Sequence, residues 1–435
     1  MLTAPTARIR LPAGVRDFLP AAAARRHALS ERLLGEFERW GFQRIITPLF
    51  ECADVLERGL GADARAAAIR FVEPVTGEVV AIRPDITPQV ARLVATRMAG
   101  AGGAIRLCYE GAVVRMATGP RGQREILQAG VELYGAAPPD GDAEVVAVAA
   151  AALAAAQVPE ARLDIGHVAL ARHALDAVAD ERQRAALAVA LRKKDRGGVA
   201  AAAGGLGRPL RALIEALPTL LGGPRDVLAR ARELRLPGPV RRALASLEEV
   251  LEATREPAEA ALGPGGITLD LGEVRGFDYY TGIRLGGYVA GAGDAVLRGG
   301  RYDQLAERYG SPARAIGFAV DIEAMAEAQS AAGTPLPPRA DGVLVAAVRD
   351  RRGEAGRVAA ALRAAGHRAA VDLGRPQSRR ALVEYAQRSG FSCVLELSRH
   401  GAFWLREGGA AEEVALELPL SLPGPRREGG PARSD

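Results

Sequence analysis

The stretch that decides the fold is EILQAGVELYG, residues Glu125–Gly135. If it is a β-strand, successive side chains point to opposite faces. The apolar face consists of Leu127, Ala129, Val131 and Leu133. The other face carries Gln128, Gly130 and Glu132. The two polar side chains would start from Cα atoms roughly 13 Å apart, so they can converge on one small ligand above the glycine.

The same alternation is typical of an edge strand with one solvated polar face. In that case Gln128 and Glu132 would only face water. The stretch by itself therefore leaves open whether its polar face binds a ligand.

Length and composition limit the class of protein. The chain has 435 residues, enough for two to three domains, and 49% of them are apolar, which excludes a disordered chain. The net charge of +5 comes from dispersed basic residues, so nucleic acid is not expected as a partner. No run approaches 18 apolar residues and no signal peptide pattern is present, so we expect a cytoplasmic protein without a membrane partner.

The cysteines and histidines predict neither disulfides nor a metal site. The three cysteines are Cys52, Cys108 and Cys393. They are far apart in the sequence and form no C-x-x-C pair, and the five histidines are equally scattered. We therefore expect no metal and no cofactor.

The first third of the chain contains recognisable elements. Ala21–Trp40 has the apolar spacing of a helix, and Phe42–Pro48 is predicted as a strand. Phe71–Arg83 is predicted as a hairpin around Thr76 and Gly77. Thr87 has the character of a helix N-cap, and Asp85 lies just before it, at a junction between a strand and a helix.

Composition predicts the domain organisation. Residues 1–330 form the expected core domain, in which residues 168–257 are nearly all helical and form an insertion. Residues 331–340 contain TPLPPR and are predicted as a stiff linker. Residues 341–417 alternate as βαβαβ, which predicts a small and mostly parallel α/β domain. Residues 418–435 are expected to be disordered.

Five motifs in this order resemble the core of class II aminoacyl-tRNA synthetases of the histidyl type. They are the helix and strand at Ala21–Pro48, RPDIT at Arg83–Thr87, Arg115 with the strand Glu125–Gly135, RGFDYYTG at Arg275–Gly282, and GGRYDQL at Gly299–Leu305 with AIGFAVDIE at Ala315–Glu323. The resemblance covers roughly residues 11–325, and residues 341–416 are more loosely similar to the anticodon-type domain. It implies an α+β fold with an antiparallel sheet flanked by helices. It also implies a homodimer through the first helix and the strand that ends at Pro48.

The resemblance also implies a histidine pocket. Its expected members are Asp85, Thr87, Arg115, Gln128, Glu132, Arg275, Tyr279 and Tyr280. In this family Asp85, Thr87 and Gln128 would hold the ammonium group of the amino acid. A free amino acid needs such acceptors, as well as a cation for its carboxylate.

The remaining contacts follow the same resemblance. Arg275 would bind the carboxylate, while Glu132 and Tyr280 would hold the imidazole. A buried carboxylate beside an imidazole rejects an apolar isostere, because each unpaired buried polar group costs about 1–3 kcal/mol. The alternative for Tyr279 and Tyr280 is strand packing, and the alternative for Arg275 is a surface charge.

The nucleotide half of the site departs from the synthetase pattern. In the second motif the family has a glutamate two positions after the arginine, and here Ala117 follows Arg115. In the third motif Asp321 replaces a glycine and Ala324 replaces the arginine that binds triphosphate. A lost charge-assisted contact costs about 1.5–3 kcal/mol, and a lost preorganised charge commonly costs about 10²–10³ in rate. Synthetase chemistry is therefore expected to be lost.

In this sequence the residues of the amino-acid pocket are retained, whereas the residues that bind the nucleotide in synthetases are replaced. This combination resembles the regulatory subunits of ATP phosphoribosyltransferase. Three stretches resemble that family of synthetase-like paralogues: LPAGVRDFLP at Leu11–Pro20, RPDITPQVARL at Arg83–Leu93 and REILQAGVELYG at Arg124–Gly135. The implied role is that of a non-catalytic subunit in the first step of L-histidine biosynthesis. It would form a hetero-oligomer around its homodimer, activate a short-form catalytic subunit, and transmit feedback inhibition by L-histidine.

Two alternatives remain at this point. One is a divergent but active histidyl-tRNA synthetase. The other is an RNA-binding protein, suggested only by the basic residues Arg351, Arg352, Arg379 and Arg380. Such charge clusters more often form a solvated face.

Overall fold

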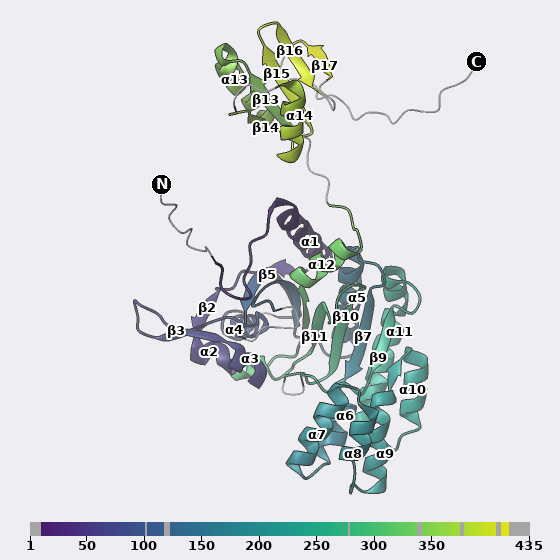
Figure 1. The fold of residues 1–435 in the computed structure, drawn as a ribbon. Helices are drawn as coiled ribbons and strands as arrows, with labels where there is room; N and C mark the ends of the chain where they lie inside the picture. The colour runs from purple at the N-terminus through teal and green to yellow at the C-terminus, as the bar shows by residue number, and fades with distance from the viewer. Residues whose placement is uncertain are drawn as a thin grey trace, which may run out of the picture. The chain divides into compact units, whose positions relative to one another are not determined.

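The computed structural model describes most of the chain and divides it into two units. The described residues are 10–100, 102–116, 122–276, 279–336, 342–374, 378–405 and 410–416. The first unit is Met1–Leu336 and the second is Pro337–Asp435 (Figure 1). The expected tail at 418–435 and residues 337–340 of the expected linker lie outside the described residues.

A nine-stranded sheet forms the centre of the first unit. In spatial order its strands are β1 (Gln43–Arg44), β5 (Ile105–Val114), β6 (Glu125–Tyr134), β12 (Ala315–Asp321), β11 (Leu297–Arg301), β10 (Ile283–Tyr288), β7 (Arg162–His167), β9 (Ile267–Asp270) and β8 (Leu221–Gly222). Most pairs are antiparallel, but β1–β5 and β7–β9 are parallel, so the sheet is mixed. Parallel neighbours need a long crossover connection, and both of these pairs are joined by more than 50 intervening residues.

Strand β6 lies inside this sheet, between β5 and β12. The edge-strand interpretation of the opening stretch is therefore wrong. The predicted alternation is confirmed: Ala129, Val131 and Leu133 are fully buried in the main core, and Leu127 packs against it. Gln128 and Glu132 are also buried, on the opposite face of the strand.

Helices cover the apolar face of the sheet. Those that contribute buried side chains to the main core include α1 (Pro20–Arg39), α5 (Asp140–Ala155), α11 (Gly238–Leu262) and α12 (Ile322–Ala331). In α1 the helical spacing brings Leu29, Leu33 and Phe37 onto one buried stripe. This packing leaves the other face of the sheet available for polar side chains.

The strand predicted at Phe42–Pro48 is shorter than expected. Only Gln43 and Arg44 pair with β5, and the chain then leaves the sheet after one more backbone bond from Ile45 to Cys108. The side chain of Ile46 is 94% exposed. Phe42 is buried and Ile45 is partly buried, so the segment packs against the first unit although most of it pairs with no strand.

A three-stranded sheet follows in the order β2 (Phe50–Cys52), β4 (Val79–Ile82) and β3 (Ile69–Val72). Helices α2 (Ala53–Arg58), α3 (Ala62–Ala67) and α4 (Thr87–Arg97) belong to the same region. The predicted hairpin is confirmed, since β3 and β4 pair antiparallel across a turn in which Gly77 has φ +74°.

Between β7 and β9 the chain is mainly helical. The helices are α6 (Val168–Asp176), α7 (Glu181–Arg192), α8 (Arg196–Ala202), α9 (Arg208–Ala216), α10 (Pro224–Arg232) and α11. In Figure 1, α6 to α9 form a group of their own beside the sheet. The helical region was expected to end near Pro257, but α11 continues through that proline to Leu262, where Gly263 with φ +79° ends it.

The second unit has a five-stranded sheet. Its strands, in spatial order, are β14 (Arg368–Val371), β13 (Gly342–Ala347), β15 (Cys393–Ser398), β16 (Gly401–Leu405) and β17 (Ala411–Val414). Helices α13 (Arg352–Ala364) and α14 (Arg379–Arg388) connect the three parallel strands, as the βαβαβ pattern predicts. The antiparallel strands β16 and β17 were not predicted.

Short 3-10 helices complete the elements, at Leu217–Thr219, Ala306–Tyr309 and Arg349–Arg351. Within the described part of the chain, no helix has the length and hydropathy needed to cross a bilayer. The same residues contain no group of three or more histidine, cysteine or acidic side chains placed to hold a metal ion.

Candidate functional site

A cavity of about 170 Å³ opens on the polar face of the large sheet, over β6, β12 and β11. Six of the eight residues predicted for histidine binding line it: Asp85, Thr87, Arg115, Gln128, Tyr279 and Tyr280. They come from three segments that are far apart in the sequence. Arg115 directly follows β5, which pairs with the β6 strand that carries Gln128. The segment of Tyr279 and Tyr280 is held against β11 by the hydrogen bond from the Thr281 N–H to the Arg301 carbonyl.

Glu132 lies beneath this cavity and is completely buried. The Tyr109 hydroxyl donates a hydrogen bond to one of its carboxylate oxygens at 3.4 Å. The other oxygen lies against Gly317, where a Cβ atom would collide with it. Burial raises the pKa of Glu132 well above its usual range, although hydrogen bonding from Thr87 and Tyr109 opposes this shift.

Several buried polar atoms around Glu132 have no hydrogen-bond partner among the described residues. They are Gln128 Oε1, Glu132 Oε2 and the hydroxyl groups of Tyr134, Tyr279 and Tyr302. Buried polar atoms in folded proteins are nearly always hydrogen-bonded to protein or to water. A cluster of this kind therefore indicates a site that a polar ligand or ordered water completes.

The expected ligand position directly above Gly130 is wrong. Tyr109 stands opposite Gly130 in the β5–β6 register, and its ring covers the glycine. A Cβ atom at Gly130 would lie 2.6 Å from the Tyr109 hydroxyl oxygen. The glycine is needed to admit this tyrosine, which in turn orients Glu132.

Arg275 is not among the residues that line the cavity. Its side chain is 46% exposed and lies 3.7 Å from the Glu273 carboxylate. The structure thus brings Glu132 and the six lining residues together and leaves Arg275 apart from them. The two residues that follow Gly276 lie outside the described residues.

The two predicted tyrosines pack against each other as well as against the cavity. The rings of Tyr279 and Tyr280 meet edge-to-face with centroids 5.3 Å apart, and Tyr279 also lies 5.2 Å from Tyr302. Loss of hydration raises the pKa of Tyr280 to about 12, so its phenol is a hydrogen-bond donor at neutral pH. Packing and ligand contact are therefore compatible roles for these side chains.

The nucleotide half of the site has taken on structural roles. Asp321 caps α12, accepting a hydrogen bond from the Ala324 backbone N–H at 2.8 Å. Ala324 is 2% exposed and belongs to the main core. Arg115 donates from Nε to the Pro84 carbonyl oxygen at 2.9 Å. Ala117 lies outside the described residues.

Sequence reasoning missed three residues at the cavity or beneath it. Tyr302 and Arg298 line it, and Tyr109 supports Glu132. Tyr302 could have been predicted from the sequence, because it lies in the quoted GGRYDQL motif. Tyr109 depends on pairing between β5 and β6, and Arg298 is an exposed arginine paired with Asp294 at 2.6 Å, so no local pattern marked either one.

A buried ion pair holds the wall of the cavity. Arg301 on β11 donates from Nε to Asp142 at 2.7 Å, and both side chains are 3% exposed. The Arg301 carbonyl also accepts a hydrogen bond from the Thr281 N–H at 2.6 Å. This fixes the segment that carries Tyr280 against the sheet.

The polar face continues along the sheet to Asp164 on β7, and this residue makes stability depend on pH. Burial, and then the nearby Asp270 carboxylate, raise the pKa of Asp164 from 3.8 to about 7. The folded state thus keeps a proton that the unfolded chain loses, so the stability from this group is present below about pH 4 and is lost as pH rises to about 7. Over this pH range the free energy of unfolding is expected to fall by an amount on the order of 4 kcal/mol, and Asp164→Asn should remove this fall.

Urea unfolding at several values between pH 4 and pH 8 would measure this difference. Equal pH dependence of the free energy of unfolding in the variant and the natural chain would contradict the raised pKa of Asp164.

Comparison with known proteins supplies the family. Residues 14–325 match the family model described as histidyl-tRNA synthetase. This range covers all five motifs and the complete cavity, and it stops within α12.

Several curated relatives are named ATP phosphoribosyltransferase regulatory subunit. One from Anaeromyxobacter dehalogenans is 45% identical over 318 residues, which cover 72% of this chain and 90% of the relative. The chain belongs to this family. A second regulatory subunit, from Geobacter metallireducens, is 41% identical over 369 residues, covering 83% of each chain.

Solved structures agree with this placement. A Bacillus halodurans protein described as an ATP phosphoribosyltransferase regulatory subunit/histidyl-tRNA synthetase is 27% identical with a TM-score of 0.77, covering 91% of this chain and all of that one. Histidyl-tRNA synthetase from Nostoc shares the fold at 19% identity, with a TM-score of 0.76. The regulatory subunit therefore has the histidyl type of class II synthetase fold.

Proposed function

We propose that this chain is a non-catalytic regulatory subunit that a short-form ATP phosphoribosyltransferase catalytic subunit requires for activity. In this proposal the cavity over β6 binds L-histidine, the end product, and binding lowers the activity of the complex. The observation that carries the proposal is the set of unpartnered polar atoms around Glu132, beside a nucleotide half in which Asp321 caps a helix and Ala324 is core.

The proposed ligand contacts follow the chemistry of the lining. Asp85, Thr87 and Gln128 accept from the ammonium group. Glu132 and Tyr280 hold the imidazole, because a buried carboxylate gains a charged partner when the imidazole is protonated. For the carboxylate we keep Arg275, which the family resemblance implies; it does not line the cavity, and its half-exposed side chain would have to give up only a 3.7 Å contact with Glu273 to reach a ligand.

Feedback inhibition requires only that histidine bind two states of the complex with different affinity. A 100-fold difference would shift the equilibrium between them by about 2.7 kcal/mol. The ligand need not reach the catalytic site of the partner.

Two measurements test the proposal. Mixing the chain with the short catalytic subunit should restore phosphoribosyl transfer to ATP, and histidine should inhibit it. The chain alone should show no histidine-dependent exchange of pyrophosphate into ATP. Robust exchange, or charging of tRNA with histidine, would establish the active synthetase instead.

A single variant tests the proposed carboxylate contact. Arg275→Ala should raise the histidine concentration needed for half-inhibition by about 10-fold or more, because a charge-assisted contact is lost. Unchanged inhibition would remove Arg275 from the site while leaving the other contacts intact.

We further propose that the complex is built around a homodimer of this chain. An unusual set of exposed apolar side chains supports it, on the segment around Pro48 and the adjacent three-stranded sheet. The set is Ile46, Leu49, Phe50, Phe71, Val72, Val75 and Val79. Exposed apolar patches of this kind are typical of protein interfaces.

Ile46→Asp should therefore shift the chain from dimer to monomer. An uncompensated charge buried at an interface costs about 3–5 kcal/mol, which corresponds to roughly 100-fold weaker association or more. Light scattering after size-exclusion chromatography would measure the mass. Val189→Asp, at an apolar residue of α7 that is 52% exposed, is the matched control and should stay dimeric.

A further inference from the structure

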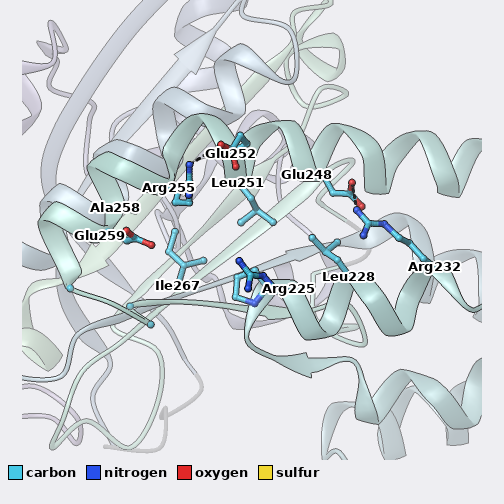
Figure 2. Close-up of a pocket in the computed structure, with 14 residues that line it drawn as sticks. Arg225, Leu228, Arg232, Glu248, Leu251, Glu252, Arg255, Ala258, Glu259 and Ile267 are labelled. Carbon is cyan, nitrogen blue, oxygen red and sulfur yellow. Dashed lines mark hydrogen bonds and ion pairs between the residues drawn. The ribbon is translucent and has the colours of Figure 1, made fainter.

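A groove of about 560 Å³ lies between α10, α11 and the start of β9, on the helical side of the first unit. Leu228, Leu251 and Ile267 point into it from these three elements (Figure 2). It is separate from the histidine cavity and shares no lining residue with it. The volume lies within the range typical of ligand-binding clefts.

The groove borders an open part of the sheet edge. Strand β8 pairs with β9 only at Leu221–Asp270 and Gly222–Leu269. The same register would place Pro224 opposite Ile267. Proline has no N–H to offer a neighbouring strand, and Pro224 already begins α10. The edge strand therefore stops before it covers Ile267.

The backbone of Ile267 faces the groove rather than β7. The Gly266 carbonyl accepts from the Leu163 N–H of β7 at 2.8 Å, whereas the Leu271 N–H donates to the Leu220 carbonyl on the opposite side at 3.0 Å. Backbone groups of alternate residues in a strand point to opposite neighbours. Ile267 and Leu271 are four residues apart, so their backbone groups point to the same side of β9. The N–H and carbonyl of Ile267 therefore point away from β7 and toward the groove.

The rim of the groove is charged and partly unpaired. Arg232 pairs with Glu248 at 2.7 Å, as Figure 2 shows. The side chains of Arg225 and Glu259 are exposed and form no hydrogen bond or ion pair with another described residue. Glu252 and Arg255 also pair, at 3.0 Å, so among the described lining residues Arg225 is the unpaired cation and Glu259 the unpaired anion beside an apolar floor.

We infer that this groove binds an extended segment of the catalytic partner. The segment adds as a strand beside Ile267, inserts apolar side chains between Leu228 and Leu251, and places an acidic side chain at Arg225 and a basic one at Glu259. Strand addition uses main-chain hydrogen bonds for affinity and side-chain pockets for specificity. The inference rests on the proposed function, because it names the surface through which that partner is held.

The experiment uses the full chain and its short catalytic subunit as the binding probe. Titration calorimetry should show about 10-fold weaker binding for Arg225→Glu and for Glu259→Arg, since each reverses a charge that the segment complements. Glu256→Arg, an exposed reversal on α11 outside the groove lining, is the matched control and should bind within twofold of the natural chain. Hydrogen exchange on the unmutated complex should show slower exchange of the Ile267 amide.

The outcomes separate this inference from the proposed function. If the natural chain binds the catalytic subunit but neither reversal weakens binding and Ile267 exchange is unchanged, the groove is not the docking surface and the regulatory role stands. If the natural chain does not bind the catalytic subunit at all, the regulatory role itself fails. Slower Ile267 exchange that depends only on the concentration of this chain would identify a second copy as the occupant and overturn the inference.

Discussion

Replacing Glu132 by glutamine is expected to make the ligand-free protein more stable and to weaken its binding of histidine. Glu132 is completely buried, and burial raises the pKa of its carboxyl group. Glutamine keeps the shape and one acceptor oxygen but has no charge to desolvate. A residue that lowers stability while it supports binding is typical of a functional site.

The sign of the stability change follows from proton linkage. The pKa of Glu132 in the folded protein lies above its ordinary value of 4.5, so the folded protein holds a proton that the unfolded chain releases. The stability contributed by this group is therefore present below about pH 4 and is lost as pH rises through and above 4.5. Glutamine does not titrate, so the Glu132→Gln variant does not lose this stability as the pH rises. Its melting temperature should exceed that of the natural chain at pH 7 and match it more closely at pH 4.

Binding should change in the opposite direction. A hydrogen bond to a charged group contributes about 1.5–3 kcal/mol, so the dissociation constant for histidine should rise about 10- to 100-fold. Calorimetry would measure binding, and thermal unfolding at pH 4 and pH 7 would measure stability. Glu125→Gln, on the same strand but exposed, should change neither quantity. A less stable Glu132→Gln variant with unchanged affinity would show that Glu132 is only structural.

Asp142→Ala is expected to cause the largest loss of stability. Its carboxylate pairs with Arg301 at 2.6 Å in a setting where both side chains are 3% exposed. Removing one partner leaves a buried charge with less compensation, which costs about 3–5 kcal/mol. Arg301 keeps a contact with Asp303 at 2.9 Å, so the lower part of that range is the expectation.

Urea unfolding would measure the effect, and Asp140→Ala provides the control. Asp140 begins the same helix but is exposed, so its loss should cost no more than about 1 kcal/mol. Asp142→Ala frees the Arg301 side chain on β11, the strand whose Arg301 carbonyl accepts from the Thr281 N–H, so any shift of this strand should weaken histidine binding as well. A change in the free energy of unfolding below about 1 kcal/mol would show that Arg301 is satisfied without Asp142.

Much of the site could be predicted because its residues lie in short sequence patterns that are recognisable without the structure. Alternation within β6 placed Gln128 and Glu132 on one face, which the structure shows to be buried. The motifs also included Asp85 and Tyr280, which line the same cavity as Gln128. The role of Gly130 could not be predicted in this way. It depends on Tyr109, which stands opposite Gly130 on the neighbouring strand, and such pairing is not visible within one segment.

The errors in the fold have similar causes. The segment Phe42–Pro48 resembles a strand, but only Gln43 and Arg44 pair with a strand of this chain. Pro257 resembles a helix end, yet α11 continues past it, because tertiary packing can override a local breaker. Both cases show long-range context overriding a local signal.

The burial of Ala324 limits what a substitution at this position can do. An arginine at this position would have to place its guanidinium in the closely packed interior behind α12, where there is no room for it without moving the helix. Ala324→Arg alone is therefore not expected to create the nucleotide contact that the synthetase pattern has at this position. Close packing around Ala324 therefore opposes the return of a cation at this position, independently of the other differences from the synthetase pattern.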